Sequence, residues 1–375
     1  MIYLDYSANT PVDARVLEQF CAVERRCIGN ANSHHQAGSA AKAEIDAATI
    51  KIASLLGVQP AEIIYTSGAS EANNFALKGL ARLSRHAGRH IISTPLEHSS
   101  VSGTLTALQE QGYEIDLLDV KQDGTVDLEH LKDLLRPDTI CVAITLVDSE
   151  LGVVQPVQEI AAILKAYPHC HLHVDATQAV GKIPVSFEGV DTMSLTAHKF
   201  YGLNGIGLLI KRRNLALEPL IHGGESTTIY RSGTPTVALA SSLACALDLA
   251  VTDLPGRVDH VAKLNAELRA ALSIYPLVRI NSPDHAIPHV LNLSVRNVKG
   301  TVFQRELDAK GVCVSVKSAC SSDGLPSRAV FAVSRDRRNA LSSWRISLSH
   351  LTTEDEIKAF VQAFDVCYRE LTAVH

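Results

Sequence analysis

The sequence predicts an α/β protein with a mainly parallel sheet and helices on both of its faces, followed by a smaller α+β domain. Between about Gln36 and Val261, short apolar segments alternate with longer amphipathic ones, which is typical of strands joined by helices. Several short segments are apolar nearly throughout, as expected for strands covered on both faces. The alternation ends after Leu254-Pro255-Gly256. At 375 residues, the chain is long enough for about two domains.

The predicted strands of the first part are short, and most of their residues are apolar. They are expected at Glu62–Thr66, His90–Thr94, Glu114–Val120, Thr139–Val147, His171–Asp175, Thr192–Thr196 and Gly205–Lys211. The predicted helices lie between these strands as crossover connections. They are expected at Ala37–Leu56, Ser70–Leu83, Ser99–Gln111, Leu128–Leu135 and Gln158–Tyr167.

The second part begins with a different pattern. A helical stretch is followed by three shorter strand-like runs and a closing helix, in the order His260–Ile274, His289–Ser294, Gly311–Val316, Arg345–Ser349 and about Thr353–Leu371. We therefore predict a large domain over residues 15–255, and a small domain that combines residues 1–14 with residues 256–375.

Composition and charge limit the classes of function. Hydrophobic residues make up 46% and charged residues 20% of the chain, which is ordinary for a soluble globular protein. The net charge of −5 leaves no basic surplus for nucleic acid. The basic run Arg335–Arg338 is interrupted by Asp336, so we interpret it as a solvated turn. No apolar run reaches the ~18–20 residues of a membrane helix. Neither a nucleic-acid partner nor a membrane is therefore expected.

Cysteines and histidines give no sign of a metal. The eight cysteines have neither C-x-x-C pairs nor zinc spacing, and the N-terminus does not resemble a secretion signal. We therefore expect a cytoplasmic protein with mostly free thiols. His169, His171 and His173 alternate along a predicted strand, but carboxylates or thiolates at ligand spacing are missing. A strand with exposed and half-buried histidines is the preferred interpretation.

Polar residues follow two neighbouring predicted strands at the edge where α/β proteins place ligand groups. Lys199 follows one strand in an apolar context, where partial desolvation would lower the pKa of its amine and make it a Schiff-base nucleophile. Asp175 ends the other strand and could hold the ring nitrogen of a pyridine cofactor in its protonated form. From residue types alone, a structural ion pair between Asp175 and Lys199 is equally plausible.

A turn of small residues, Thr66-Ser67-Gly68-Ala69-Ser70-Glu71, links a predicted strand to a predicted helix. Backbone N–H groups at such a helix start favour a phosphate group, and the hydroxyls add further donors. The alternative is that Ser70 only caps the helix.

Two further residues stand in unusual surroundings. Cys320 lies in the small, polar segment Lys317–Gly324, although cysteines usually prefer burial, and Lys317 would favour its thiolate. An incidental loop thiol is equally possible. Arg345 lies among apolar residues of a strand-like segment, so it needs an anionic partner. A substrate carboxylate and an internal Asp or Glu both fit.

Taken together, these segments resemble the pyridoxal-phosphate-dependent cysteine desulfurases of iron–sulfur cluster assembly, in the class V aminotransferase group. The resemblance covers nearly the whole chain, from Tyr3-Leu4-Asp5-Tyr6-Ser7-Ala8 to Leu351-Thr352-Thr353-Glu354. The segments that carry it are Thr66–Asn74, Glu97-His98, Gly152–Pro156, His173–Gln178, His198-Lys199, Arg231–Thr234 and Ser318–Ser322. It implies the fold of a fold-type I pyridoxal-phosphate enzyme, with pyridoxal 5'-phosphate as cofactor.

The resemblance also implies roles for single residues. Lys199 would bind the cofactor covalently, Asp175 would pair with the ring nitrogen, and Gln178 would bond the ring oxygen. His98 would stack on the ring and move protons. Arg345 would hold the carboxylate of L-cysteine. The phosphate would be held by Ala69, Ser70, Thr196 and His198, and by Thr234 from the partner subunit of a homodimer.

In this family, the cysteine that corresponds to Cys320 would attack the substrate sulfur and leave a persulfide on the enzyme and alanine as product. A sulfur-acceptor protein, either a cluster scaffold or a tRNA-thiolation enzyme, would then take the sulfur. The same scaffold also serves selenocysteine lyases and cysteine lyases, and a weakened sulfur-relay subunit is a further alternative.

One departure from the family pattern bears on the cofactor. Asp148-Ser149-Glu150 stands where relatives usually have Asn-Asn-Glu. We expect Asp148 to lie beside the phenolate oxygen of the cofactor, where a shared proton would avoid the repulsion of two like charges.

Overall fold

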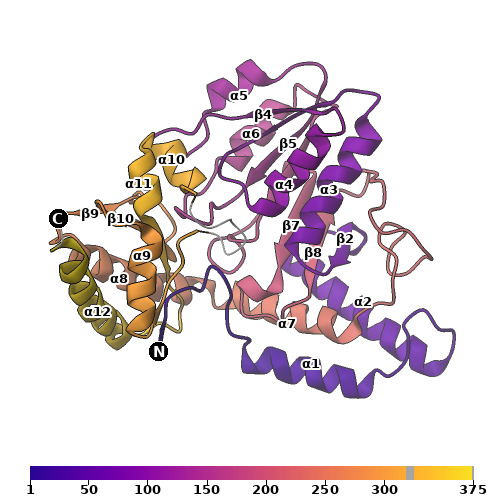
Figure 1. Cartoon of the computed structure of the whole chain (residues 1–375). Coiled ribbons are helices and arrows are strands. Elements are labelled where there is room, and N and C mark those ends of the chain that lie inside the picture. Colours follow the sequence, from indigo (N-terminus) through magenta and orange to yellow (C-terminus); the bar gives the residue numbers. More distant parts are fainter. Residues whose placement is uncertain (318–324, 374–375) are drawn as a thin grey trace.

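The computed structural model describes residues 1–317 and 325–373, which form a large part around a central sheet and a smaller part that contains the C-terminus (Figure 1). The central sheet has the strand order β2-β8-β7-β6-β5-β3-β4. Its strands are β2 (Ile63–Thr66), β3 (His90–Ser93), β4 (Glu114–Leu117), β5 (Thr139–Thr145), β6 (His171–Asp175), β7 (Thr192–Thr196) and β8 (Gly207–Lys211). Only β8 runs antiparallel to its neighbours, so the prediction of a mainly parallel sheet is confirmed.

Alternate residues of the buried strands face two different helical layers, as β5 illustrates. Cys141 and Ala143 pack against α3 (Ala69–Ser84) and α4 (Ser99–Gln109), whereas Val142 and Ile144 pack on the opposite side. The opposite layer consists of α2 (Gln36–Leu56), α5 (Leu128–Leu134), α6 (Val157–Leu164) and α7 (Val237–Thr252). Both faces of the sheet are therefore covered, which explains why β5 is apolar nearly throughout.

The smaller part is built on an antiparallel sheet of order β12-β10-β9, namely β12 (Ser343–Ser347), β10 (Val290–Val295) and β9 (Val278–Ile280). A short parallel pair joins β1 (Ile2–Tyr3) to β11 (Val312–Cys313). The surrounding helices are α8 (Leu254–Leu272), α9 (Gly300–Ala309), α10 (Arg328–Ser334), α11 (Arg337–Ser342) and α12 (Glu354–Thr372). Its core centres on Trp344, which stacks on Phe303 and packs against Phe360 and Phe364.

Two sequence-based expectations about the second part were wrong in detail. Leu254-Pro255-Gly256 is the first turn of α8, one residue after α7 ends, because proline is tolerated at the start of a helix where its missing N–H has no partner to lose. Arg335 ends α10, and Asp336 caps α11 by accepting hydrogen bonds from Arg338 N and Asn339 N. The basic run is exposed, as predicted, and Arg335 and Asp336 lie between the two helices, but Arg337 and Arg338 already belong to α11.

No helix in residues 1–317 and 325–373 is by itself long and apolar enough to cross a membrane. Helices α7 and α8 pass that test only as a pair, with a bend of 64° between them.

The strand directions place several polar residues at one edge. Strands β2, β5, β6 and β7 run in the same direction, so their carboxyl ends at Thr66, Thr145, Asp175 and Thr196 meet along that edge. This is the position where ligands bind in open α/β sheets.

Candidate active site

A cavity of about 310 Å³ lies at the carboxyl edge of the central sheet. Its wall includes nine residues that the sequence singled out, namely Ala69, Ser70, His98, Asp175, Gln178, Thr196, His198, Lys199 and Arg345. It also includes residues to which the sequence gave no role, such as Ser7, Ala8, Thr145, Ser149 and Thr177.

Lys199 enters the cavity from a short 3-10 turn, Ala197–Lys199, that follows β7 directly. Its Nζ donates hydrogen bonds to the carbonyl oxygens of Ser7 at 2.7 Å and Ala8 at 2.6 Å. The amine is therefore presented to the cavity by an N-terminal segment that is distant in sequence.

Asp175 ends β6 on the same wall and is 3% exposed. Its Oδ2 accepts from Asn73 Nδ2 at 2.8 Å, and its Oδ1 accepts from Thr177 N at 2.9 Å. Asn73 in turn is held through its Oδ1, which lies 3.0 Å from His173 Nε2. Hydrogen bonds to both carboxylate oxygens fix the direction of this side chain.

Of the three alternating histidines, His169 is exposed and His171 is half-buried, as expected, but His173 is not. His173 is completely buried rather than half-buried, and burial lowers its pKa to about 4. A buried neutral ring is a hydrogen-bonding element behind Asp175. The described residues contain no group of three or more His, Cys, Asp or Glu side chains that could hold a metal ion.

His98 caps α4 and lines the cavity. Its Nδ1 accepts from Ser100 N at 3.1 Å, so the ring proton belongs on Nε2. Burial lowers the pKa of His98, and the positive charges of Lys199 and Arg328 act in the same direction. The ring is therefore a neutral imidazole near neutral pH.

The start of α3 forms a cradle for an anion. Gly68 precedes the helix with φ 153° and ψ 178°, a conformation that favours glycine, and no side chain caps the first turn. Ser70 lies inside this first turn, so the alternative that Ser70 only caps the helix was wrong. Thr196 and His198 complete the cradle, and burial lowers the pKa of His198 to about 4. Uncapped N–H groups at a helix start attract phosphate.

Arg345 is 1% exposed on β12, and both alternatives for its partner are relevant. Its Nη2 pairs with Asp5 Oδ1 at 2.9 Å, and its Nη1 donates to Ser149 O at 2.7 Å. Its buried Nε has no hydrogen-bond partner within residues 1–317 and 325–373. Asp5 therefore pairs with the Nη2 group of Arg345, while the Nε–H group remains as a donor for an anion.

Gln178 is held from behind by a buried lysine. Its Nε2 donates to Ser7 O at 2.9 Å, and its Oε1 accepts from Lys182 Nζ at 3.0 Å. Because the Ser7 carbonyl oxygen can only accept, the Nε2 end of the amide must face it, which leaves Oε1 to accept from Lys182. Ser7 O thus receives hydrogen bonds from both Gln178 and Lys199.

Asp148 does not line the cavity, contrary to its predicted position beside the cofactor. Its carboxylate is fully buried in the turn after β5 and accepts from Leu151 N, whereas the neighbouring Ser149 reaches the cavity wall. Burial, together with the negative charge of Glu150, raises the pKa of Asp148 to about 7.

The sequence gave no role to a second buried carboxyl near the site. Glu97 Oε1 accepts from Thr94 Oγ1 and Thr145 N, each at 2.8 Å, and burial raises its pKa to about 8. Only its position before His98 in a quoted motif could have drawn attention to it.

Two predicted residues are not part of this cavity. Thr234 is exposed and does not line it, and its predicted role belongs to a partner subunit. Cys320 lies outside the described residues. Beside that segment, Lys317 Nζ donates to Leu325 O at 2.9 Å.

The fold and the cavity are those of a pyridoxal-phosphate enzyme of the aminotransferase class-V type: residues 2–360 match the family model for aminotransferase class-V, and the chain belongs to this family. Among its relatives, "Cysteine desulfurase IscS" of Proteus mirabilis is 40% identical over 95% of this chain and 90% of its own length. A solved structure titled "NIFS-LIKE PROTEIN" has a TM-score of 0.93 and 36% identity over 99% of this chain and 100% of its own. Another, "SspA in complex with cysteine", has a TM-score of 0.82 and 31% identity, covering 94% and 100% of the two chains.

Proposed function

We propose that the protein is a cysteine desulfurase, which converts L-cysteine to L-alanine and retains the sulfur as a persulfide on Cys320. The observation that carries this proposal is that Lys199, Asp175 and Arg345 line one cavity. Similar proteins named cysteine desulfurase, and a related structure described as a complex with cysteine, support it.

The cavity suits pyridoxal 5'-phosphate. The uncapped start of α3 matches a phosphate, and the fixed carboxylate of Asp175 matches a protonated ring nitrogen. The Thr177 hydroxyl and Arg345 Nε are buried without hydrogen-bond partners among the described residues, which is expected of groups that await a ligand. Ala69, Ser70, Thr196 and His198 would hold the phosphate, Gln178 the ring oxygen and His98 the ring face. When bound, the cofactor supplies an electron sink for negative charge at the substrate α-carbon.

The chain's own residues then orient the substrate and move its protons. Arg345 binds the substrate carboxylate through its remaining donor. Lys199 can accept and return a proton at its amine, and His98 offers a neutral ring with the proton on Nε2.

Sulfur transfer requires a thiolate. The Cys320 thiolate forms a sulfur–sulfur bond with the substrate sulfur as the carbon–sulfur bond breaks, and protonation of the carbon gives L-alanine. A sulfur-acceptor protein removes the persulfide sulfur. We further propose a homodimer in the cytoplasm, in which Thr234 reaches the phosphate of the neighbouring subunit.

Mass spectrometry after incubation with L-cysteine tests the function directly. We expect one added sulfur on Cys320 and formation of alanine. Cys320→Ser should keep the yellow cofactor band and lose sulfide release, and Lys199→Ala should lose the borohydride-reducible covalent adduct. Pyruvate and ammonia as products would contradict the proposal and indicate a cysteine lyase. Turnover of selenocysteine alone would indicate a selenocysteine lyase.

A further inference from the structure

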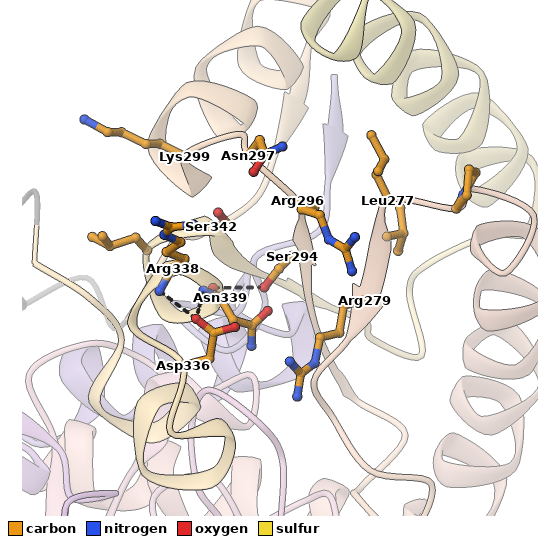
Figure 2. Close-up of a pocket in the computed structure, with 13 residues that line it drawn as sticks. Leu277, Arg279, Ser294, Arg296, Asn297, Lys299, Asp336, Arg338, Asn339 and Ser342 are labelled. Carbon is orange, nitrogen blue, oxygen red and sulfur yellow. Dashed lines mark hydrogen bonds between the residues drawn. The ribbon is translucent and has the colours of Figure 1, made fainter. Parts of the chain in front are cut away.

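A second hollow, of about 410 Å³, lies on the smaller part of the protein, and none of its lining residues belongs to the candidate active site (Figure 2). Figure 2 shows Arg279 and Arg296 on the strand side of this hollow, with Asp336, Arg338 and Asn339 across from them. The strand side comes from β9 and the end of β10, and the opposite side comes from α11 and its cap.

The register of β9 and β10 explains why two arginines share this face. Arg279 pairs with Ser294 and Val278 pairs with Val295. Because side chains alternate along a strand, Arg279 and Arg296 point to the same side as diagonal neighbours, whereas Val295 points into the core. Diagonal neighbours in such a pair are only about 7–8 Å apart at their Cα atoms.

The hollow has an excess of positive charge. Its lining contains Arg279, Arg296, Lys299 and Arg338 but only one acid, Asp336. The four cations are exposed, and none has an acidic side chain within 4.0 Å in the part of the chain that the structure describes. The carboxylate of Asp336 already accepts from Arg338 N at 2.9 Å and Asn339 N at 3.1 Å.

Elsewhere on the surface, exposed arginines commonly pair with acidic side chains. Exposed arginines such as Arg15 and Arg369 pair with acids at 2.8 and 2.9 Å. Since cations gathered at one place repel one another, the hollow is arranged to receive negative charge from outside the chain.

The floor is rigid and polar. Asn339 Nδ2 donates to Asn281 Oδ1 at 2.9 Å, and Asn281 Nδ2 donates to Ser294 Oγ at 2.8 Å. Ser294 Oγ in turn donates to Asn339 O at 3.2 Å, so the three residues form a closed ring of hydrogen bonds. Apolar groups of Pro276, Leu277 and Leu341 complete the wall.

These features favour a protein segment over nucleic acid. Apolar wall groups next to cations match a segment that carries both carboxylates and an apolar side chain. Single-stranded nucleic acid is instead bound by aromatic stacking platforms, and no aromatic side chain lines the hollow in the described residues. We propose that this hollow is the docking site for an acidic, amphipathic segment of a partner protein. The proposal is independent of the reaction at Lys199.

The test uses the holoenzyme and a fluorescein-labelled, glutamate-rich peptide with one central leucine as the probe, read by fluorescence anisotropy. The double variant Arg279→Glu/Arg296→Glu should bind the peptide at least tenfold more weakly, which is about 1.4 kcal/mol, and wild-type affinity should fall as salt is added. The matched control is Arg25→Glu/Arg85→Glu, which makes the same change of charge at two exposed arginines outside the hollow and should bind as the wild type does.

A third arm replaces leucine in the peptide by glutamate, and a fourth uses an RNA oligonucleotide. Loss of affinity without leucine supports the apolar contribution of the wall. The proposal is overturned if the wild type does not bind the peptide, or if both double variants weaken binding equally. Tighter binding of RNA that is lost only in Arg279→Glu/Arg296→Glu would also overturn it, in favour of a nucleic-acid surface. Thermal melting of each variant verifies that it is folded.

Discussion

Replacing Lys182 by methionine should stabilise the protein at and below neutral pH, although this lysine supports the candidate active site. Lys182 is 6% exposed, and its Nζ donates to Gln178 Oε1. Burial, together with the positive charges of Lys199 and Arg345, lowers the pKa of Lys182 to about 7, compared with 10.5 for an ordinary lysine. The folded protein therefore holds this proton less tightly than the unfolded chain does.

The difference between these two pKa values corresponds to about 5 kcal/mol, at ~1.4 kcal/mol for each pKa unit. Because the unfolded chain binds more protons between the two values, stability rises as the pH rises from about 7 to 10.5. The free-energy cost of burying the charged Lys182 is fully present below pH ~7. Methionine removes it but also removes the hydrogen bond to Gln178, which offsets about 1 kcal/mol. The unfolding free energy of the variant should therefore exceed that of the wild type by up to about 4 kcal/mol at low pH. This gain should disappear near pH 10.5, the pKa of an ordinary lysine.

Urea unfolding of the cofactor-free protein across a pH series measures this difference. Lys211→Met is the matched control, because Lys211 is 2% exposed and its Nζ donates to Leu215 O at 2.7 Å and Arg212 O at 3.1 Å. Burial lowers the pKa of Lys211 as well, but its Nζ serves two backbone carbonyl groups, and both lose their donor in this variant. Lys211→Met should therefore be less stable than Lys182→Met near neutral pH. If Lys182→Met were destabilised near neutral pH as much as Lys211→Met, Lys182 would be a well-solvated ammonium and the reasoning would be wrong.

Three other variants have expected outcomes. Asp5→Ala should cost about 3–5 kcal/mol of unfolding free energy in a denaturation assay, because it leaves the buried charge of Arg345 unpaired. Asp46→Ala, which breaks the exposed pair with Lys42, is the control and should cost less than about 1 kcal/mol. Asp148→Asn should gain stability over the wild type as the pH rises from 3.8 to about 7 and keep this gain at higher pH, because the raised pKa of Asp148 means that its ionisation opposes folding; identical pH profiles for variant and wild type would contradict this. Gly68→Ala should lower the melting temperature and weaken cofactor binding in an absorbance titration, since its φ of 153° strains any other residue by about 1–3 kcal/mol. Gly103→Ala in α4, where the added methyl meets nothing within 4 Å, is the comparison: it should raise the melting temperature slightly, because alanine favours a helix over glycine, and leave cofactor binding unchanged.

The fold was predictable where local pattern and tertiary position agree. His171–Asp175 and Thr192–Thr196 were predicted with the observed bounds, because each is a short strand that ends in a polar residue. By contrast, α7 was not predicted, since it is apolar on most sides and its sequence has little helical periodicity. It is buried against the sheet and against α1 (Ala14–Arg26) and α2, so its position depends on contacts that no local pattern reveals.

For the candidate site, the sequence predicted which residues share the edge of the sheet but not the contacts that hold them. The ends of parallel strands share an edge, and this rule brought Lys199 and Asp175 to one cavity. Their hydrogen-bond partners could not be predicted, because Asn73 contacts Asp175 across 102 positions in sequence and Ser7 contacts Lys199 across 192. Asp148 was misplaced because its prediction rested on the position of a motif, which does not tell whether Asp148 or Ser149 faces the cavity.

The first ten residues contact both parts of the protein. Ile2 pairs with Val312 in β11, and Asp5 bridges Ser347 in β12, while a few residues later Thr10 donates from both its backbone N and its Oγ1 to His198 O. A fusion tag joined directly to Met1, or removal of these residues, should therefore disturb ligand binding even though none of the ten was predicted to take part in the chemistry. For purification, an affinity handle at the opposite terminus is the safer choice.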